Sequence, residues 1–429
     1  DYINEPDLES RGFYRLGVPA ERRLYEVTGL PAPDDRIYGL DELRGHLDGL
    51  STRPFDRQPG LDEDPADTPA RRLVGRRQIE YWKDDLQAPH SIGEVGKLAL
   101  PRRSYQMALT PGLIDEVYRS DGQNRVDGSL LREAGYVERD GGWWAPSGIR
   151  HYDDGDDGFY RPVEYEDIFG GRYRQTYDRF AMFVVRLDRP EFGVAGASTP
   201  RLTTHIEHDY RALRPRVTAD PNGNKVVLRY DPLGMVEARA SVGSTGEGDS
   251  LDDVSGGIPA EVTTDPADPV AFLEDLVDHA PALLQSATER VFVDLDRYQN
   301  GGRPACVLNV RRRTHASELD NGETSEVELA ITYLDGLGRE VMRKQKVAPG
   351  PAPARDADTG ELVEREGELV VEQSDPRWVG TGRTVFDNKG KPVKQYEPFF
   401  AASPRFDDES QLVERGVTPV MHDDPLGGL

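Results

Sequence analysis

The sequence has almost no cysteine and no long hydrophobic run, and each shortage excludes a class of protein. The single cysteine, Cys306, rules out an intramolecular disulfide framework, which is compatible with a reducing compartment without proving one. Its place in the apolar run ACVLNV, Ala305–Val310, predicts a small buried side chain. No stretch approaches the ~20 apolar residues of a membrane-spanning helix, so we expect no direct membrane insertion.

Lysine is also scarce, and acidic residues greatly outnumber basic ones. Asp and Glu total 78 against 53 Lys and Arg, only 8 of which are Lys, so the formal net charge is -25. Such a surface repels nucleic acid and anionic lipid, and we expect no nucleic-acid partner. Dense carboxylates with Arg in place of Lys are typical of acidic proteins from halophilic organisms, in which concentrated salt screens the self-repulsion.

Glycine and proline are plentiful. The 429 residues include 44 Gly and 32 Pro, and 36% are hydrophobic, which favours many short strands and turns over long helices. The length suits two or three ordinary domains, or one sheet spread along a repeat. The chain begins with Asp1 and no secretory hydrophobic segment follows, so we interpret it as a fragment or a processed piece.

A strand followed by an Asp-Gly turn recurs along the chain. Tyr230–Gly234 (YDPLG) follows alternating apolar residues at 226, 228 and 230, and Asp335–Arg339 (DGLGR) follows such residues at 327, 329, 331 and 333. Asp accepts hydrogen bonds from the backbone of its own turn and Gly supplies positive φ, so each copy can reverse the chain. Weaker copies are Asp167–Gly170, Asp220–Asn224 and Asp424–Gly427.

The most distinctive segment, Arg377–Phe400, is predicted to form a hairpin. Thr384–Phe386 favours a strand, Asp387–Gly390 a turn, and Val393–Tyr396 the returning strand. The segment offers no nucleophile, metal cluster or phosphate-binding loop, so it indicates architecture rather than chemistry.

These turns resemble YD repeats of the Rhs type, and Arg377–Phe400 resembles the B component of the insecticidal toxin complex (Tc) toxins. The resemblance covers most of the chain from Tyr105 onward, and the first hundred residues, including Gly12–Leu30, fit less specifically. The other segments that carry it are Asp140–Ile149, Phe159–Asp178, Asp209–Val236 and Gly246–Leu251.

The resemblance implies an all-β, curved shell segment with one or two small peripheral helices and no enzymatic role, catalytic residue or cofactor. In that family the B component and its C partner form a hollow shell around a cytotoxic polypeptide, which a pore-forming A component delivers. The implied partners are therefore the remainder of a B component and a C-component-like chain, within a secreted complex. The β-propeller and the aspartyl self-cleavage module of the family have no counterpart here, and we interpret His422–Leu429 as a truncated YD turn.

Composition predicts four segments: residues 1–104, 105–242, 243–268 and 269–429. The first is β-rich and holds a Pro-rich loop, Asp56–Arg72, and the third is a flexible Gly, Ser and Asp-rich loop. Short helices are expected between Thr110 and Ala134, and a longer one at Pro269–Ser286, interrupted by Pro281. A Pro-rich insert, Pro349–Gly367, is expected to loop out of the sheet.

Three constellations raise the hypothesis of a metal or catalytic site. His205, His208 and Asp209 contain zinc-ligand types, but strand residues three apart face opposite sides. Asp294 and Asp296 would share one strand face like a glycosidase carboxylate pair, yet no sugar-stacking cluster accompanies them. The run Asp153–Asp157 could hold calcium, although it lacks the bidentate Glu of a calcium loop. We therefore assign no catalytic, cofactor or metal residue from the sequence.

Two further clusters suggest contact surfaces. The basic run at 311, 312, 313 and 315 is either an ion-paired sheet surface or a contact for an acidic partner. Trp143 and Trp144, with aromatic residues at 159, 160, 165 and 173, either fill a core or stack on sugars. The second possibility gives the alternative function, a secreted β-rich carbohydrate- or cell-surface-binding module. A shell segment would scatter with a radius of gyration above the ~22 Å expected of a compact domain of this length.

Overall fold

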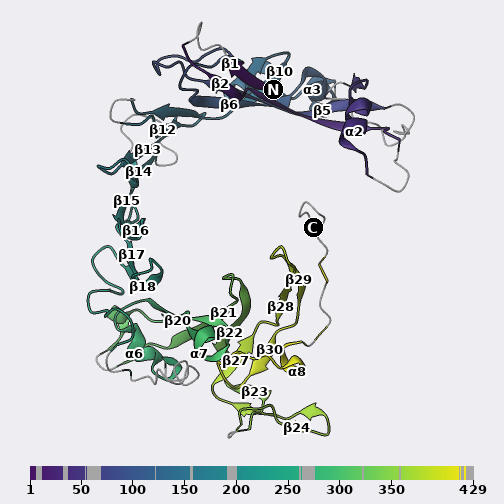
Figure 1. Ribbon diagram of the computed structural model, residues 1–429. Coiled ribbons are helices and arrows are strands. Elements are labelled where there is room, and N and C mark those ends of the chain that lie inside the picture. The colour runs from purple at the N-terminus through teal and green to yellow at the C-terminus, as the bar shows by residue number, and fades with distance from the viewer. Residues whose placement is uncertain are drawn as a thin grey trace. The chain divides into compact units, whose positions relative to one another are not determined.

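The computed structural model in Figure 1 divides into two compact units, Asp1–Thr203 and Thr204–Leu429. The structure describes residues 1–5, 12–31, 37–53, 55, 69–120, 122–154, 158–190, 201–259, 262, 276–320, 323–356, 359–414, 416 and 420–421. The predicted acidic loop at 155–157, the Pro-rich loop at 56–68 and the terminal turn at 424–427 lie outside these ranges.

The first unit consists of short strands and three helices in its described part. The strands are β1 (Tyr2–Glu5), β2 (Arg15–Pro19), β3 (Glu21–Thr28), β4 (Ser51–Arg53), β5 (Ala70–Tyr81), β6 (Pro101–Leu109), β7 (Arg119–Ser120), β8 (Gln123–Asn124), β9 (Val137–Arg139), β10 (Gly142–Pro146), β11 (Ile149–Tyr152), β12 (Pro162–Glu166), β13 (Arg172–Tyr177) and β14 (Val184–Pro190). The helices are α2 (Leu40–Leu47), α3 (Pro111–Val117) and α4 (Gly128–Glu133).

Two groups of paired strands organise this unit. One sheet has the order β3-β5-β6-β10-β9, with β4 parallel to β5. After it, β11 to β14 pair antiparallel in chain order. Helices α3 and α4 begin where expected, because Thr110 and Asp127 accept backbone N–H bonds at their N-caps.

The second unit is a longer antiparallel meander with small attachments. Its strands are β15 (Arg201–Asp209), β16 (Arg214–Ala219), β17 (Lys225–Tyr230), β18 (Val236–Val242), β19 (Glu289–Asp294), β20 (Ala305–Arg312), β21 (Val327–Leu334), β22 (Glu340–Val347), β23 (Gly350–Pro353), β24 (Glu364–Arg365), β25 (Glu368–Leu369), β26 (Val371–Ser374), β27 (Arg377–Gly380), β28 (Thr384–Phe386), β29 (Pro392–Gln395) and β30 (Phe399–Ala401). Its helices are α6 (Ala280–Leu284), α7 (Arg297–Gly301), α8 (Ser410–Val413) and the 3-10 turn η1 (Ala316–Glu318).

The main sheet of this unit runs in chain order from β15 to β22 and continues with β27 and β30. Every one of these pairings is antiparallel, so consecutive connections lie at opposite ends of the strands. The predicted all-β class is confirmed, and the helices are short, seven in the described part rather than one or two. None of the described helices has the length and apolar character needed to cross a membrane.

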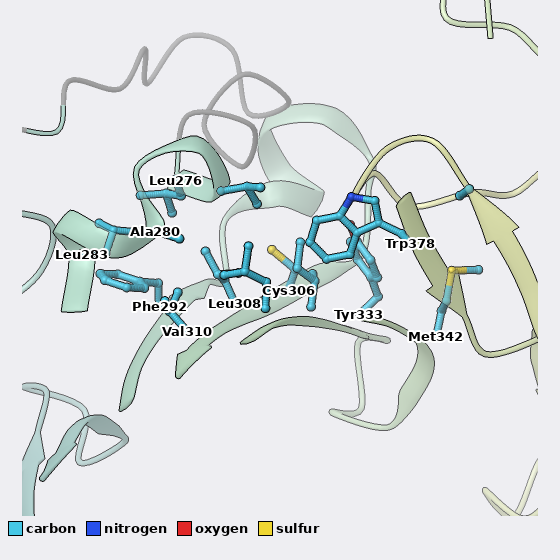
Figure 2. Close-up of a cluster of buried hydrophobic side chains, with 14 of the residues drawn as sticks. Leu276, Ala280, Leu283, Phe292, Cys306, Leu308, Val310, Tyr333, Met342 and Trp378 are labelled. Atoms are coloured by element: carbon cyan, nitrogen blue, oxygen red, sulfur yellow. The ribbon is translucent and has the colours of Figure 1, made fainter. Parts of the chain in front are cut away.

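The largest hydrophobic core lies on one face of this sheet, as Figure 2 shows. Alternate residues of β20 and β21 point into it, including Leu308, Ile331 and Tyr333, as the period-2 pattern predicts. Leu276, Ala280 and Leu283, the last two on α6, cover Phe292 and Leu308 from the other side. Cys306 is buried among them, which confirms its prediction as a small core residue.

The predicted helix at Pro269–Ser286 is confirmed where it can be seen. Residues 269–275 lie outside the described part, residues 276–278 are helical, and α6 begins at Ala280 after a break at His279. The break lies just before Pro281, which stands in the first turn of α6, because proline is tolerated in a first turn and disrupts a helix that continues through it.

The segment Arg377–Phe400 forms two nested hairpins rather than one. The inner pair, β28 with β29, joins Thr384 to Gln395 and Val385 to Lys394, as predicted. The outer pair, β27 with β30, belongs to the main sheet. The insert after β22 forms separate two-stranded pairs, β23-β26 and β24-β25, in agreement with a segment outside that sheet. The finer division at residues 104, 242 and 268 stays a prediction.

Candidate functional site

The recurrent Asp-Gly turns share one hydrogen-bonding pattern. In Asp335–Arg339 the Asp335 N–H donates to the Arg339 carbonyl over 3.0 Å, and Gly338 N–H donates to the Asp335 carbonyl over 3.0 Å. The Asp335 carboxylate accepts from the backbone N–H groups of Leu337 and Arg339. Gly338 has φ +77°, which a residue with a side chain rarely adopts. The backbone pattern repeats at 167–171, 220–224, 231–235 and 387–391.

A further turn of this type was missed from the sequence. Gly243 N–H donates to the Glu247 carbonyl and Gly246 N–H donates to the Gly243 carbonyl, with Gly246 at φ +95°. The predicted flexible loop at 243–268 therefore begins with an ordered hairpin turn in its described part. The turn was missed because Gly243 occupies the first position, which Asp holds in the other turns. A search for Gly four residues after a strand end, as Gly338 follows Leu334, would have found it.

Hydrogen bonding stabilises the ionised carboxylate in two of these turns, those of Asp335 and Asp387. For Asp387, the backbone N–H groups of Lys391 and Lys389 lower the pKa. For Asp335, burial favours the neutral acid, but bonds from Arg339 and Leu337 outweigh it and the pKa is lowered. The acidic turn residues are therefore structural groups that hold the reversal in place.

One row of side chains across the main sheet forms the floor of the core. Paired positions place neighbouring strands' residues side by side in the order Phe292, Leu308, Ile331, Lys344, Gly380 and Phe399. The Phe399 ring lies over Gly380, where an added Cβ would come within 2.6 Å of the ring. A polar row of Glu289, Arg311 and Glu328 occupies alternate positions.

A buried group of charges, missed from the sequence, extends this row. Lys344 is fully buried and pairs with Asp407, and it also donates to the Ser403 carbonyl over 3.1 Å. Arg355 donates to Asp407 and Glu409 over 2.7 Å each. We call Lys344, Arg355, Asp407 and Glu409 the clasp. It joins β22, the insert and the segment before α8.

Electrostatics in the clasp follow from its burial. Burial lowers the pKa of the Lys344 ammonium, and the Asp407 carboxylate opposes that shift. For Glu409, burial acts to raise the pKa, but the bond from Arg355 prevails and lowers it. The sequence does hold a signal for Lys344. It lies two residues after Met342 on the same strand, so the period-2 pattern places it on the same buried face.

The predicted metal and carboxylate constellations do not form sites in the described part. On β15 the strand stays regular, because the extra residue of the local irregularity, Arg216, lies on β16. His205 and His208 therefore face opposite sides, as expected. The prediction for Asp294 and Asp296 was wrong: β19 ends at Asp294, whose carboxylate accepts the Asp296 backbone N–H over 3.1 Å.

The predicted basic run separates into individual partners. Arg312 is buried and donates to the Ala287 carbonyl over 2.6 Å, while Arg313 pairs with Glu326 and Glu328. His315 contacts the fully buried Asp249 carboxylate over 2.7 Å. Arg312 and Arg313 are thus ion-paired within this unit, as the structural interpretation of the run expects.

The aromatic cluster also divides between core and surface. Trp143 and Trp144 are buried, so their core interpretation is confirmed, whereas Phe159 is largely exposed. Tyr165 and Tyr173, with ring centroids 6.0 Å apart, line a hollow of about 540 Å³ in the first unit. Of the acidic run, the described Asp153 pairs with Arg161 over 2.9 Å.

One group of possible metal ligands was not predicted. His151, Glu164 and Glu166 hold ligand atoms within 4.8 Å of one another, on paired strands β11 and β12. Arg174 pairs with Glu164 and Arg172 pairs with Glu166 over 3.1 Å. Because both carboxylates already face a guanidinium, an ion-pair network explains the group without a cation.

These features define a class: an antiparallel β-meander whose strands are joined by a recurrent Asp-Gly turn. Solved Tc toxin chains share this fold. The crystal structure of TcdB2-TccC3 matches with a TM-score of 0.57 and 20% identity over 80% of this chain. The crystal structure of TcdB2-TccC3-Cdc42 matches with a TM-score of 0.59 and 18% identity over 86% of this chain. The Photorhabdus luminescens Tc holotoxin pore matches with a TM-score of 0.58 and 18% identity over 81% of this chain.

The resemblance seen in the sequence is thus confirmed for the fold. This chain spans only 15%, 19% and 18% of the length of those three chains. No family model matches the sequence, and no curated protein matches it.

Proposed function

We propose that this chain is a structural, non-enzymatic part of a toxin complex, forming a segment of a Rhs-type shell that encloses and protects a cytotoxic polypeptide. The observation that carries the proposal is the meander of β15 to β22, β27 and β30, joined by the recurrent turn, on a fold shared with Tc toxin chains. A wall of this kind needs hydrogen-bonded strands and firm reversals, and the turn carboxylates are committed to them.

The clasp and the core support the same role. A container must stay folded, and the row from Phe292 to Phe399 buries one sheet face under α6 and the segment before α8. We propose as partners the remainder of a B component and a C-component-like chain with a toxic C-terminus, and indirectly a pore-forming A component. The complex would be secreted.

The test is to express this chain with the proteins encoded beside its gene and to purify them in concentrated salt. We expect co-elution and protection of the partner's C-terminal segment from protease. The partner expressed alone is the first control. The variant Ile331→Asp, which places a charge in the core row, should abolish protection, and the surface variant Asn222→Asp should keep it. Separate elution, or a partner segment cleaved equally fast with and without this chain, would contradict the proposal.

One observation favours the alternative, a carbohydrate- or cell-surface-binding module. Tyr165 and Tyr173 line the hollow in the first unit together with Glu164 and Asp188, and aromatic rings beside carboxylates suit sugar recognition. The four tryptophans, the strongest stacking residues, are all buried. Glycan binding by the intact chain that Tyr165→Ala removes, without a change in folding, would support the module.

A further inference from the structure

The connections at one edge of the main sheet in the second unit share an apolar character. Because the strands are antiparallel in chain order, the connections β15-β16, β17-β18, β19-β20 and β21-β22 all lie at the same end of the strands. We call the border of the sheet formed by these strand ends one edge, and the border at the other strand ends the opposite edge. These four connections carry exposed large apolar side chains, which we call the apolar edge: Tyr210, Leu213, Leu233, Leu295, Tyr298 and Leu337.

The exposed side chains at this edge include two that lie in Asp-Gly turns. Leu233 and Leu337 occupy the third position of the Asp-Gly turn and are 72% and 78% exposed, and Tyr298 is 73% exposed. At the opposite edge the β16-β17 turn holds Asn222 in that same third position. The turn itself therefore does not require an apolar residue there.

Several charged groups at this edge are bonded within the protein. Arg211 donates to the carbonyls of Pro232 and Tyr230, over 3.0 Å and 3.2 Å. Arg339 pairs with Asp335, and Arg383 pairs with Glu414 over 3.1 Å. The edge therefore offers a partner these apolar side chains, together with exposed charged residues such as Asp296 and Glu340.

A hollow lies beside the protruding side chains. It has a volume of about 740 Å³ and is lined by Leu295, Tyr298, Val341 and Phe406 among others, between the β19-β20 connection and the β21-β22 turn. The same edge therefore has both side chains that project and a space that can receive one, as a self-complementary surface requires.

We propose that the apolar edge is a contact surface and that its partner is the same edge of a second copy of this chain. Connections at one edge recur every second strand, which is roughly 10 Å at normal strand spacing. Two copies related by a two-fold axis present rows of equal spacing to each other, so their side chains can interdigitate.

The exposed area is large enough to matter. Six large apolar side chains, each about 40% or more exposed, give a surface on the order of several hundred Å². One partner of a standard interface contributes ~800 Å², so the summed area of these side chains approaches what a weak, specific dimer needs.

Salt gives this contact a distinctive signature. Each copy carries a formal charge of -25, which opposes association at low ionic strength. At ~1 M salt the Debye length falls to ~3 Å and the repulsion is screened, while apolar contact is unaffected or strengthened. Association through the apolar edge should therefore tighten as salt rises, whereas an ion-paired contact would weaken.

Sedimentation velocity on the purified chain tests the proposal at 0.15 M and 2 M KCl. We expect a monomer-dimer equilibrium that is at least about tenfold tighter in 2 M KCl. Leu233→Asp and Leu337→Asp should each weaken it by about tenfold or more, since central apolar side chains dominate such contacts. Asn222→Asp is the matched control, with the same charge change at the same turn position on the opposite edge, and should leave dimerisation within twofold.

Circular dichroism checks that the three variants remain folded, which we expect because the positions are exposed. A chain that stays monomeric at ~100 μM in 2 M KCl would overturn the proposal. So would dimerisation that Leu233→Asp and Leu337→Asp leave as unaffected as Asn222→Asp does. Binding to neutral phospholipid vesicles without self-association would likewise assign the edge to a different partner and overturn it.

Discussion

Two cross-strand rows, one in each unit, use the same kind of meander for opposite chemistry. In the first unit, paired positions on β11 to β14 bring together His151, Glu164, Arg174 and Asp188. In the second unit, the corresponding kind of row on β19 to β22 is Phe292, Leu308, Ile331 and Lys344. The charged row is mostly half-buried, whereas Leu308, Ile331 and Lys344 are almost completely buried.

The difference shows that the turn and the sheet face are specified separately. Asp167–Gly171 connects two strands of the charged row and Asp335–Arg339 connects two strands of the apolar row, with one hydrogen-bonding pattern. The turn fixes strand order, and the row decides whether the face gathers a core. Lys344 is the exception, a charge placed in the apolar row and neutralised by Asp407.

Asp407→Ala should have the largest effect on this comparison. It leaves the Lys344 ammonium buried without its carboxylate, which costs about 3–5 kcal/mol of unfolding free energy. Local hydrogen exchange should show the loss in the second unit. The double variant Lys344→Met/Asp407→Leu is the control and should recover most of the stability. If Asp407→Ala alone cost less than ~1 kcal/mol, the clasp would not be a buried ion pair.

Ile331→Ala should rank next. It removes a fully buried side chain from the middle of the apolar row and leaves a cavity, at a cost of about 2–5 kcal/mol. The loss of unfolding free energy is measured by denaturant unfolding of the second unit. Unfolding is followed by hydrogen exchange at Trp378 or by protease cleavage of β20 to β22. Ile331→Val is the matched control, at about 0.5–1.5 kcal/mol. Equal losses for both would show that the row is not tightly packed.

Gly338→Ala and Gly170→Ala should cost similar amounts, about 1–2 kcal/mol each, because both glycines have positive φ, +77° and +84°. The two variants test the comparison directly, since the turn of Gly338 connects two strands of the apolar row and the turn of Gly170 connects two strands of the charged row. Hydrogen exchange within each unit gives the two losses. Gly336→Ala, in the same turn without positive φ, is the control. A loss in only one unit would contradict a shared turn energy.

Acid should weaken both units through depressed carboxyl pKa values. The pKa of Asp335 is lowered in the folded chain, and so is that of Glu21, where bonds from Gln78 and Arg76 outweigh the effect of burial. Ionised, each stabilises the fold above its unfolded pKa of about 4, and this stability is lost as pH falls through the folded pKa. Asp335→Asn should flatten the acid dependence in the second unit only, and Glu21→Gln in the first only.

Arg174→Ala should have the smallest effect. Its pair with Glu164 is partly exposed, and such pairs contribute ~0–1 kcal/mol and less in concentrated salt. Thermal unfolding at 0.1 M and 2 M KCl should show a small loss that disappears at the higher concentration. Arg174→Lys, which keeps the charge, is the control. A large loss that persists in 2 M KCl would mean that the charged row stabilises its unit as the apolar row does.

Much of this fold could be predicted from local patterns. Apolar residues alternate along β21, and the turns at 335 and 387 carry their own Asp and Gly, so the strands and reversals follow from nearby residues. The clasp could not be predicted, because Lys344, Arg355 and Asp407 lie far apart along the chain and only the packing brings them together. The supposed pair Asp294 and Asp296 failed for the opposite reason, since β19 ends between them.

The sequence by itself determined where the chain reverses, which strand faces are apolar and how acidic the surface is, because turn chemistry, side-chain alternation and net charge depend on neighbouring residues or on composition alone. The tertiary structure decided the strand register, the burial of Lys344 with Asp407, and the gathering of Leu233, Tyr298 and Leu337 at one edge. Those outcomes depend on which strands pair, and pairing is settled by the free energy of the whole sheet rather than by any one segment.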